Sequence, residues 1–255
     1  PLGNKSTTLE IVIHQWWAIA ILRIKSMDVR GDSAEISFHQ PESRIQSEHP
    51  WPAPWLSKKT GNSAFYLTNA IQLLDQPGEW FLDMQNRRII YWPRAGEDMR
   101  TANVVAPVLQ TLLSVRGTPD NPVSHVYFKN LDFRYTTWLR PSQAGHVPLQ
   151  AGMFLLDAYK LKIPGTPDKK GLENQGWIGR QPAGVELSYV HHTAFERCNF
   201  TRMAATGLDY VRGSHYDNIT GCLFYDIGGT AIQAGSFSDE SFETHLPFNP
   251  SDERS

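Results

Sequence analysis

Long apolar runs are missing from this sequence, as are the motifs of several common protein classes. No stretch approaches the roughly 20 consecutive apolar residues of a bilayer-spanning helix. Lysines and arginines number 24 against 26 aspartates and glutamates, without basic blocks, so nucleic acid and anionic membranes are poor candidate partners. A phosphate-binding loop, a dinucleotide fingerprint, a nucleophile elbow and zinc-ligand spacing are also absent. We therefore expect neither a cofactor nor a metal site.

What the sequence does contain is an internal repeat between residues 184 and 235. Six positions recur 24 residues later with matching size and polarity: Phe195/Ile219, Cys198/Cys222, Phe200/Phe224, Met203/Ile227, Thr206/Thr230 and Leu208/Ile232. Each copy holds short apolar-alternating runs between small or polar turns, which is typical of strands. A fixed period of this length indicates stacked supersecondary units. The pattern predicts an all-β fold, a right-handed parallel β-helix of about 24 residues per coil, with stacked residues roughly 4.8 Å apart.

An earlier copy of the repeat lies at residues 125–133. There HVYFKNLDF matches HTAFERCNF, at residues 192–200, with an offset of 67. Because 67 is not a multiple of 24, the chain must leave the coil and return, and we expect a long inserted loop at 138–181. Long structured loops on a scaffold tend to carry function.

The N-terminal part, residues 1–117, predicts a mixed strand and helix module ahead of coils in residues 118–255. Within this module we expect strands over 9–38, a loop over 41–60, a helix over 64–74 and a hairpin over 79–93. The sequence begins with Pro-Leu-Gly and ends with Glu-Arg-Ser, without a signal peptide. Since a solenoid needs capped ends, we interpret the chain as a fragment of a longer polypeptide that completes the solenoid.

Cysteine is scarce, with two residues among 255, and Cys198 and Cys222 occupy equivalent positions in the repeat. We interpret them as stacked thiols that pack as small apolar groups, because a disulfide would need favourable geometry between coils. They leave the redox compartment of the protein open.

Aligning the repeat also predicts a column of polar side chains on one outer face. The preceding apolar residues would point inward, so alternation places Glu186, Asp209 and Gln233 outward and above one another. Stacked carboxylates raise one another's proton affinity, and such a pair can supply an acid and a nucleophile. The plainer alternative is a solvated polar face.

The inserted loop 138–181 would leave and rejoin the edge that carries Asp209. It is polar and holds two tryptophans, and aromatic faces stack on sugar rings while carboxylates and arginine bind hydroxyls. The loop also holds Asp168, for which an ordinary exposed turn is the alternative. The candidate substrate-binding residues are Glu186, His146, Trp138, Trp177, Gln233 and Glu240.

Three stretches, YLTNAIQLLDQPGEWFLD with IIYWPRAGEDM, TTWLRPSQAGHVPLQ through GWIGR, and ATGLDYV through ETHLPFNP, resemble large secreted bacterial right-handed β-helix proteins. Among carbohydrate-active enzymes they resemble glycoside hydrolase family 141. The resemblance implies α-L-fucosidase activity on complex pectin, or xylanase activity, with two catalytic aspartates that match Asp168 and Asp209. It also implies a secreted, periplasmic or cell-surface protein with a carbohydrate partner.

Three functions therefore compete. The first is a glycoside hydrolase acting on plant-type polysaccharide or its oligosaccharides through Asp209 and Asp168. The second is a polysaccharide lyase on a uronate-containing glycan, which would use Lys160, Arg180 or His146 as a base, often with Ca²⁺. The third is a non-catalytic carbohydrate-binding solenoid, since fold alone does not fix function.

Overall fold

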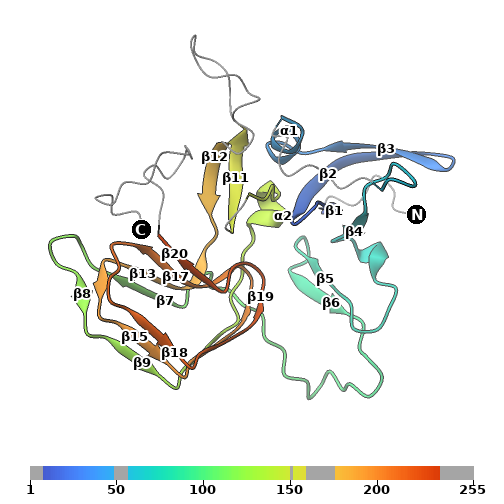
Figure 1. The fold of residues 1–255 in the computed structure, drawn as a ribbon. Coiled ribbons are helices and arrows are strands. Elements are labelled where there is room, and N and C mark those ends of the chain that lie inside the picture. The colour runs from blue at the N-terminus through green and yellow to red at the C-terminus, as the bar shows by residue number, and fades with distance from the viewer. Residues whose placement is uncertain (1–7, 49–56, 150–151, 159–175, 236–255) are drawn as a thin grey trace, which may run out of the picture. The chain divides into compact units, whose positions relative to one another are not determined.

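A computed structural model describes residues 8–48, 57–149, 152–158 and 176–235 (Figure 1). The chain divides into two compact units. Unit 1 comprises Pro1–Val104 with Arg140–Pro148, and unit 2 comprises Val105–Leu139 with Leu149–Ser255. The division falls at Val104, ahead of the boundary at 117 that the sequence suggests, and part of the inserted loop returns to unit 1. Among the described residues, no helix is long and apolar enough to cross a membrane.

Unit 1 is built on a four-stranded antiparallel sheet of order β3-β2-β1-β4. Its strands are β1 (Glu10–His14), β2 (Ile19–Arg30), β3 (Ser33–Phe38) and β4 (Phe65–Thr68). Alternation in β2 buries Ala20, Leu22 and Ile24 on one face. The strands predicted over 9–38 are confirmed. So is the hairpin over 79–93, which pairs β5 (Trp80–Asp83) with β6 (Arg88–Tyr91).

Two element predictions for unit 1 are wrong. Residues 64–74 do not form a helix: the strand β4 pairs with β1, and only the single 3₁₀ turn η1 (Ile71–Leu73) follows. The free edge of β1 offers unpaired backbone groups, and pairing with them overrides a weak helical spacing. The loop expected over 41–60 contains the helix α1 (Glu42–Glu48).

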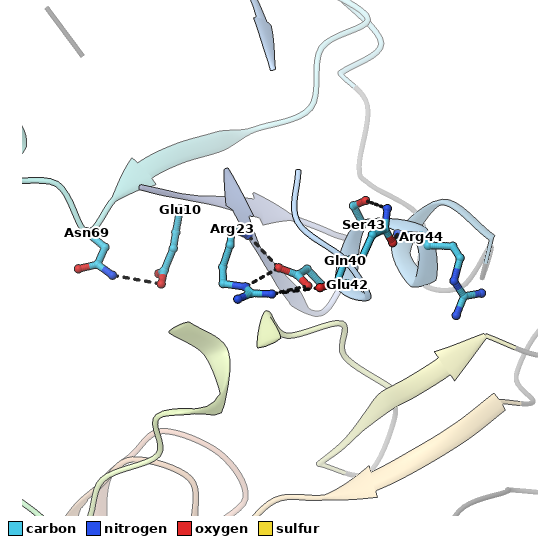
Figure 2. Close-up of polar contacts among 7 residues, drawn as sticks. All are labelled: Glu10, Arg23, Gln40, Glu42, Ser43, Arg44 and Asn69. Carbon is cyan, nitrogen blue, oxygen red and sulfur yellow. Dashed lines mark hydrogen bonds and ion pairs between the residues drawn. The ribbon is translucent and has the colours of Figure 1, made fainter. Parts of the chain in front are cut away.

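A buried ion pair holds α1 against β2 (Figure 2). The Glu42 side chain is 1% exposed and accepts hydrogen bonds from Arg23 Nε at 2.7 Å and Arg23 Nη2 at 3.1 Å. The same guanidinium donates to the carbonyl of Gln40 at 3.2 Å. A Cβ added at Gly145 would lie 2.4 Å from Glu42 Cγ, so the returning segment packs directly on this carboxylate. That segment contains α2 (Arg140–Ala144) and pairs with β2 through His146 and Ile21.

Unit 2 consists of short strands in five small sheets, parallel except for one hairpin. The largest sheet, of order β20-β17-β13-β7, contains β7 (Leu113–Arg116), β13 (Ala183–Ser188), β17 (Thr206–Arg212) and β20 (Ile232–Ala234). One three-stranded sheet contains β9 (Tyr127–Lys129), β15 (Ala194–Glu196) and β18 (Asn218–Thr220). A second three-stranded sheet contains β10 (Asp132–Arg134), β16 (Asn199–Met203) and β19 (Leu223–Ile227). The remaining pairs are β8 (Val123–Ser124) with β14 (Val190–His191), and the antiparallel β11 (Met153–Ala158) with β12 (Gly176–Arg180).

The register predicted from the repeat is confirmed. Phe195 pairs with Ile219, and Phe200 with Phe224, at the expected offset. The earlier copy also aligns, because Phe128 pairs with Phe195. Their rings stack, with centroids 4.7 Å apart for Phe128 and Phe195 and 4.6 Å apart for Phe200 and Phe224. These rings belong to the apolar core of unit 2, in which Phe195 and Phe200 are fully buried.

The predicted fold class, a right-handed parallel β-helix, is wrong. The described strands form seven small separate sheets of two to four strands, with antiparallel sheets in unit 1, and no closed solenoid is present. The reason is that a repeat specifies which residues lie opposite each other on paired strands, which is a local property. It does not specify that successive strands continue into one closed coil.

The two cysteines pack as the sequence suggests. Both are free thiols, Cys198 buried and Cys222 partly buried. The amide of Cys198 donates to Cys222 Sγ at 3.4 Å, and burial raises the pKa of the Cys222 thiol. They act as small apolar side chains of the core.

Candidate functional site

The polar column expected from the repeat lies on the four-stranded sheet of unit 2. Glu186 pairs with Asp209, and Asp209 pairs with Gln233, so the three residues lie at one register on the successive strands β13, β17 and β20, which Figure 1 labels. Ser114 on β7 extends the column by one strand, because it pairs with Glu186. The predicted stacking of these three residues is therefore confirmed, and it brings two carboxylates onto neighbouring strands.

Asp209 is the most enclosed carboxylate of the column. Its side chain is 2% exposed and accepts two hydrogen bonds from one edge of a guanidinium, with Arg180 Nε donating at 2.6 Å and Arg180 Nη2 at 2.5 Å. Burial raises the pKa of Asp209, the two Arg180 contacts oppose this, and the neighbouring charge of Glu186 adds to the rise. The site thus holds a carboxyl group of raised proton affinity in a fixed orientation.

Glu186 stands in a more open environment. Its side chain is 24% exposed and accepts from Arg116 Nη2 at 2.8 Å, while Arg116 Nε donates to Ser114 Oγ at 3.0 Å. The column therefore carries two carboxylates of different character, one enclosed and one facing solvent. Arg116 was not among the sequence candidates. Aligning β13 with the earlier run LSVR at Leu113–Arg116, which forms β7, would have identified Arg116 from the sequence.

One end of the β11–β12 hairpin contacts the column. Arg180 ends β12 and reaches Asp209, as described above. At the same end of the hairpin, where Met153 pairs with Arg180, a Cβ added at Gly152 would lie 2.2 Å from Thr230 Oγ1, just before β20. A glycine is required there also because its φ is +73°. Both strands of the hairpin therefore meet the sheet that carries Asp209 at one end of the hairpin.

Trp138 serves the packing of this hairpin. Its ring lies 5.6 Å from that of Phe154 on β11, and Phe154 is 5% exposed. A Cβ added at Gly179 would come within 2.4 Å of the Phe154 ring, so the two hairpin strands close tightly on that side chain. The indole of Trp138 thus contributes to the apolar base of the hairpin.

The structure does not bring all the sequence candidates together. His146 belongs to unit 1, where burial and the charge of Arg140 lower its pKa to about 4. Asp168, Lys160 and Glu240 lie outside the described residues, and Trp177 lies on β12 without a described side chain. Within the described part of the chain, no group of three His, Cys, Asp or Glu residues could hold a metal ion.

Comparison with known proteins gives two similarities. Residues 2–94 match the family described as "GH141 insertion domain". A solved structure titled "Glycoside hydrolase" is similar over 97% of this chain, with 49% sequence identity and a TM-score of 0.88. The chain spans 42% of the length of that structure. A comparison with curated proteins gives no match. The similarity to glycoside hydrolase family 141 that the sequence motifs suggest is therefore supported by both matches.

Proposed function

We propose that this chain is part of a glycoside hydrolase that acts on plant-type polysaccharide or oligosaccharide, with α-L-fucosidase-like or xylanase-like specificity. The observation that carries the proposal is the 49% identity to a solved structure titled "Glycoside hydrolase", because it extends over 97% of this chain. The family match at residues 2–94 agrees with it. Since a plant polymer is encountered outside the cell, we also propose a secreted, periplasmic or cell-surface location.

Asp209 is the proposed general acid of this reaction. A general acid must keep its proton near the working pH, and glycosidases achieve this by placing one carboxyl group in a desolvated environment. Burial raises the pKa of Asp209, which is the required direction. Asp168 is the proposed second carboxylate, which activates water or attacks the sugar through an oxocarbenium-like transition state. In this scheme Arg180 is a positioning residue that fixes the Asp209 carboxyl plane.

One observation favours a second candidate, a carbohydrate-binding unit without turnover. Asp209 is 2% exposed and bidentately paired, which is also the geometry of a structural anchor that holds β12 on the sheet. The lyase alternative has less support, because Arg180 is engaged by Asp209. A lyase would release an unsaturated product that absorbs in the near ultraviolet, which a hydrolase does not form.

The test is substitution of each proposed carboxylate by its amide. Asp209→Asn and Asp168→Asn are assayed on α-L-fucosyl and β-D-xylosyl aryl glycosides, with thermal unfolding measured in parallel. Asp132→Asn is the matched control, because Asp132 is a carboxylate of unit 2 that lies 42% exposed on a different sheet. We expect turnover to fall about 10²- to 10⁴-fold in the first two variants and to persist in the control. Unchanged turnover in both Asp209→Asn and Asp168→Asn would remove these aspartates from the mechanism.

A further inference from the structure

Two neighbouring strands of the largest sheet in unit 2 present four polar side chains at adjoining registers. β7 pairs with β13 so that Ser114 lies opposite Glu186 and Arg116 lies opposite Ser188. Exposure alternates along both strands, and each of the four residues is more exposed than the residue before it, which packs in or against the core of unit 2. The four side chains therefore share the outer face of the sheet. We call Ser114, Arg116, Glu186 and Ser188 together the polar quartet.

The guanidinium of Arg116 is held in place although most of it faces solvent. Its Nε donates to Ser114 Oγ at 3.0 Å, and its Nη2 donates to Glu186 Oε1 at 2.8 Å, while the side chain is 68% exposed. Within the described part of the chain, no acceptor reaches Nη1 of Arg116. Two bonds to a planar fork fix its orientation, so little entropy remains to be lost when a ligand binds Nη1.

Glu186 and Ser188 also keep bonding capacity. The Glu186 side chain is 24% exposed, and among the described residues only Arg116 donates to it, through Oε1. The Ser188 hydroxyl, two residues further along the same face, has no side-chain hydrogen bond to any described residue. A carboxylate oxygen on a largely buried side chain needs a donor from water or from a ligand. The polar quartet thus offers one acceptor, one donor and one hydroxyl to a ligand.

The charges of the polar quartet decide which ligand it fits. Arg116 and Glu186 neutralise each other, so a phosphate or a uronate would face the open oxygen of Glu186 and be repelled by it. A metal ion would find a single carboxylate beside a cation, whereas such ions need several oxygen ligands. A neutral ligand with two adjacent hydroxyls can donate to Glu186 Oε2 and accept from Arg116 Nη1. A sugar ring has this arrangement.

The polar quartet lies beside the proposed general acid. Glu186 pairs with Asp209 across β13 and β17, and neighbouring strands lie about 4.8 Å apart. Burial raises the pKa of Asp209, and the charge of Glu186 adds to this rise, so the two carboxyl groups lie close together. A sugar whose hydroxyls are bound by Glu186 and Arg116 is therefore held next to Asp209.

From these observations we infer that the polar quartet is a subsite for a neutral sugar, in which Glu186 and Arg116 bind two adjacent hydroxyls. The inference rests on the proposed function, because it assigns a binding role to side chains beside the proposed acid. It adds that β7 takes part in substrate binding and that this subsite discriminates against a uronate.

The test changes each contacting residue separately in the full 255-residue chain. Glu186→Gln and Arg116→Met each remove one contact, and an exposed pair of this kind contributes little to stability, so both variants should fold. The matched control is Glu196→Gln. Glu196 is 34% exposed and lies 2.9 Å from Lys129 Nζ across the β9–β15 pairing, so it belongs to a similar ion pair on another sheet of unit 2.

Two measurements are made on each variant. Calorimetric titration gives the affinity for methyl β-D-xylopyranoside, for methyl α-L-fucopyranoside and for methyl β-D-glucuronide, which is the xyloside with an added carboxylate. Aryl glycoside turnover gives kcat and KM. We expect a neutral glycoside to bind the parent more tightly than the glucuronide. Glu186→Gln and Arg116→Met should each weaken that binding about tenfold or more, the value of one hydrogen bond to a charged group.

The kinetic constants should change in the same sense. KM should rise about tenfold in Glu186→Gln and in Arg116→Met while kcat stays within about threefold, because binding common to the substrate and the transition state is lost. Glu196→Gln should behave as the parent in both measurements.

Several results would overturn the inference. These are an unchanged affinity and KM in both variants, an equal loss in Glu196→Gln, and no binding of either neutral glycoside to the parent. Tightest binding of the glucuronide, lost in Arg116→Met, would identify an anion site instead. A fall in kcat of more than about 100-fold at constant KM in Glu186→Gln would make Glu186 a catalytic residue. Binding that depends on Glu186 and Arg116, without turnover of any aryl glycoside by the parent, would refute only the proposed function.

Discussion

Replacing Arg180 with methionine removes a charge and keeps much of the side-chain volume beside Asp209. Asp209 is 2% exposed, and Arg180 contacts both of its oxygens, at 2.6 and 2.5 Å. Removing one partner of a buried ion pair costs about 3–5 kcal/mol, because the remaining charge stays desolvated. Arg116→Met is the matched control in the same column, since Arg116 is 68% exposed and Glu186 is 24% exposed. An exposed pair of this kind contributes about 0–1 kcal/mol.

The loss in Arg180→Met should depend on pH in a defined direction. Burial already raises the pKa of Asp209, and removal of Arg180 raises it further. A carboxyl group with a raised pKa in the folded state penalises folding only when it ionises. The penalty is therefore absent below the unfolded pKa of about 3.9 and grows as pH rises towards the folded pKa. The difference from the parent should thus be larger at pH 7 than at pH 4.5.

Urea unfolding followed by circular dichroism measures these differences, with the m value checked for each variant. The double variant Arg180→Met/Asp209→Asn should recover most of the lost stability, because it leaves no buried charge. The reasoning is refuted if Arg180→Met and Arg116→Met differ by less than about 1 kcal/mol at pH 7. It is also refuted if the loss in Arg180→Met is the same at both pH values.

Three further predictions follow from the packing. Glu42→Ala should lower the free energy of unfolding by about 3–5 kcal/mol, because the Arg23 guanidinium then loses the carboxylate of Glu42, whose side chain is 1% exposed. Urea unfolding measures this loss. Phe200→Ala should cost about 3–5 kcal/mol by thermal or urea unfolding, since Phe200 is fully buried, and a loss below about 1 kcal/mol would contradict the assigned core. Gly152→Ala should destabilise the chain, because the new Cβ would lie 2.2 Å from Thr230 Oγ1, and adding Thr230→Gly should recover part of the loss in thermal midpoint.

The sequence was informative where local pattern decides structure. Equivalent residues of neighbouring parallel strands lie opposite each other, so matching residues such as Phe200 and Phe224 disclosed the register. The same register placed Glu186 and Asp209 on adjacent strands. Turn chemistry likewise predicted the β5–β6 hairpin. These features depend on contacts whose partners can be aligned within the sequence itself.

The rest depends on contacts that no alignment within the chain can predict. β4 is a strand because β1 has a free edge, and its own apolar spacing favours a helix. The pairing of Arg180 with Asp209 requires knowledge of where the β11–β12 hairpin lies on the sheet. Whether successive short strands continue into one coil also depends on non-local contacts. The predicted register was therefore correct, although the predicted fold class was wrong.

The most direct test of the account is the pH dependence of kcat/KM for the parent and for Asp209→Asn on the aryl glycoside that the parent cleaves. If Asp209 is the general acid, the rate should fall by about 10²- to 10⁴-fold, and the alkaline limb of the profile should disappear with the titrating proton. A variant that stays folded and keeps the parent's rate and both limbs of the profile would contradict the central claim.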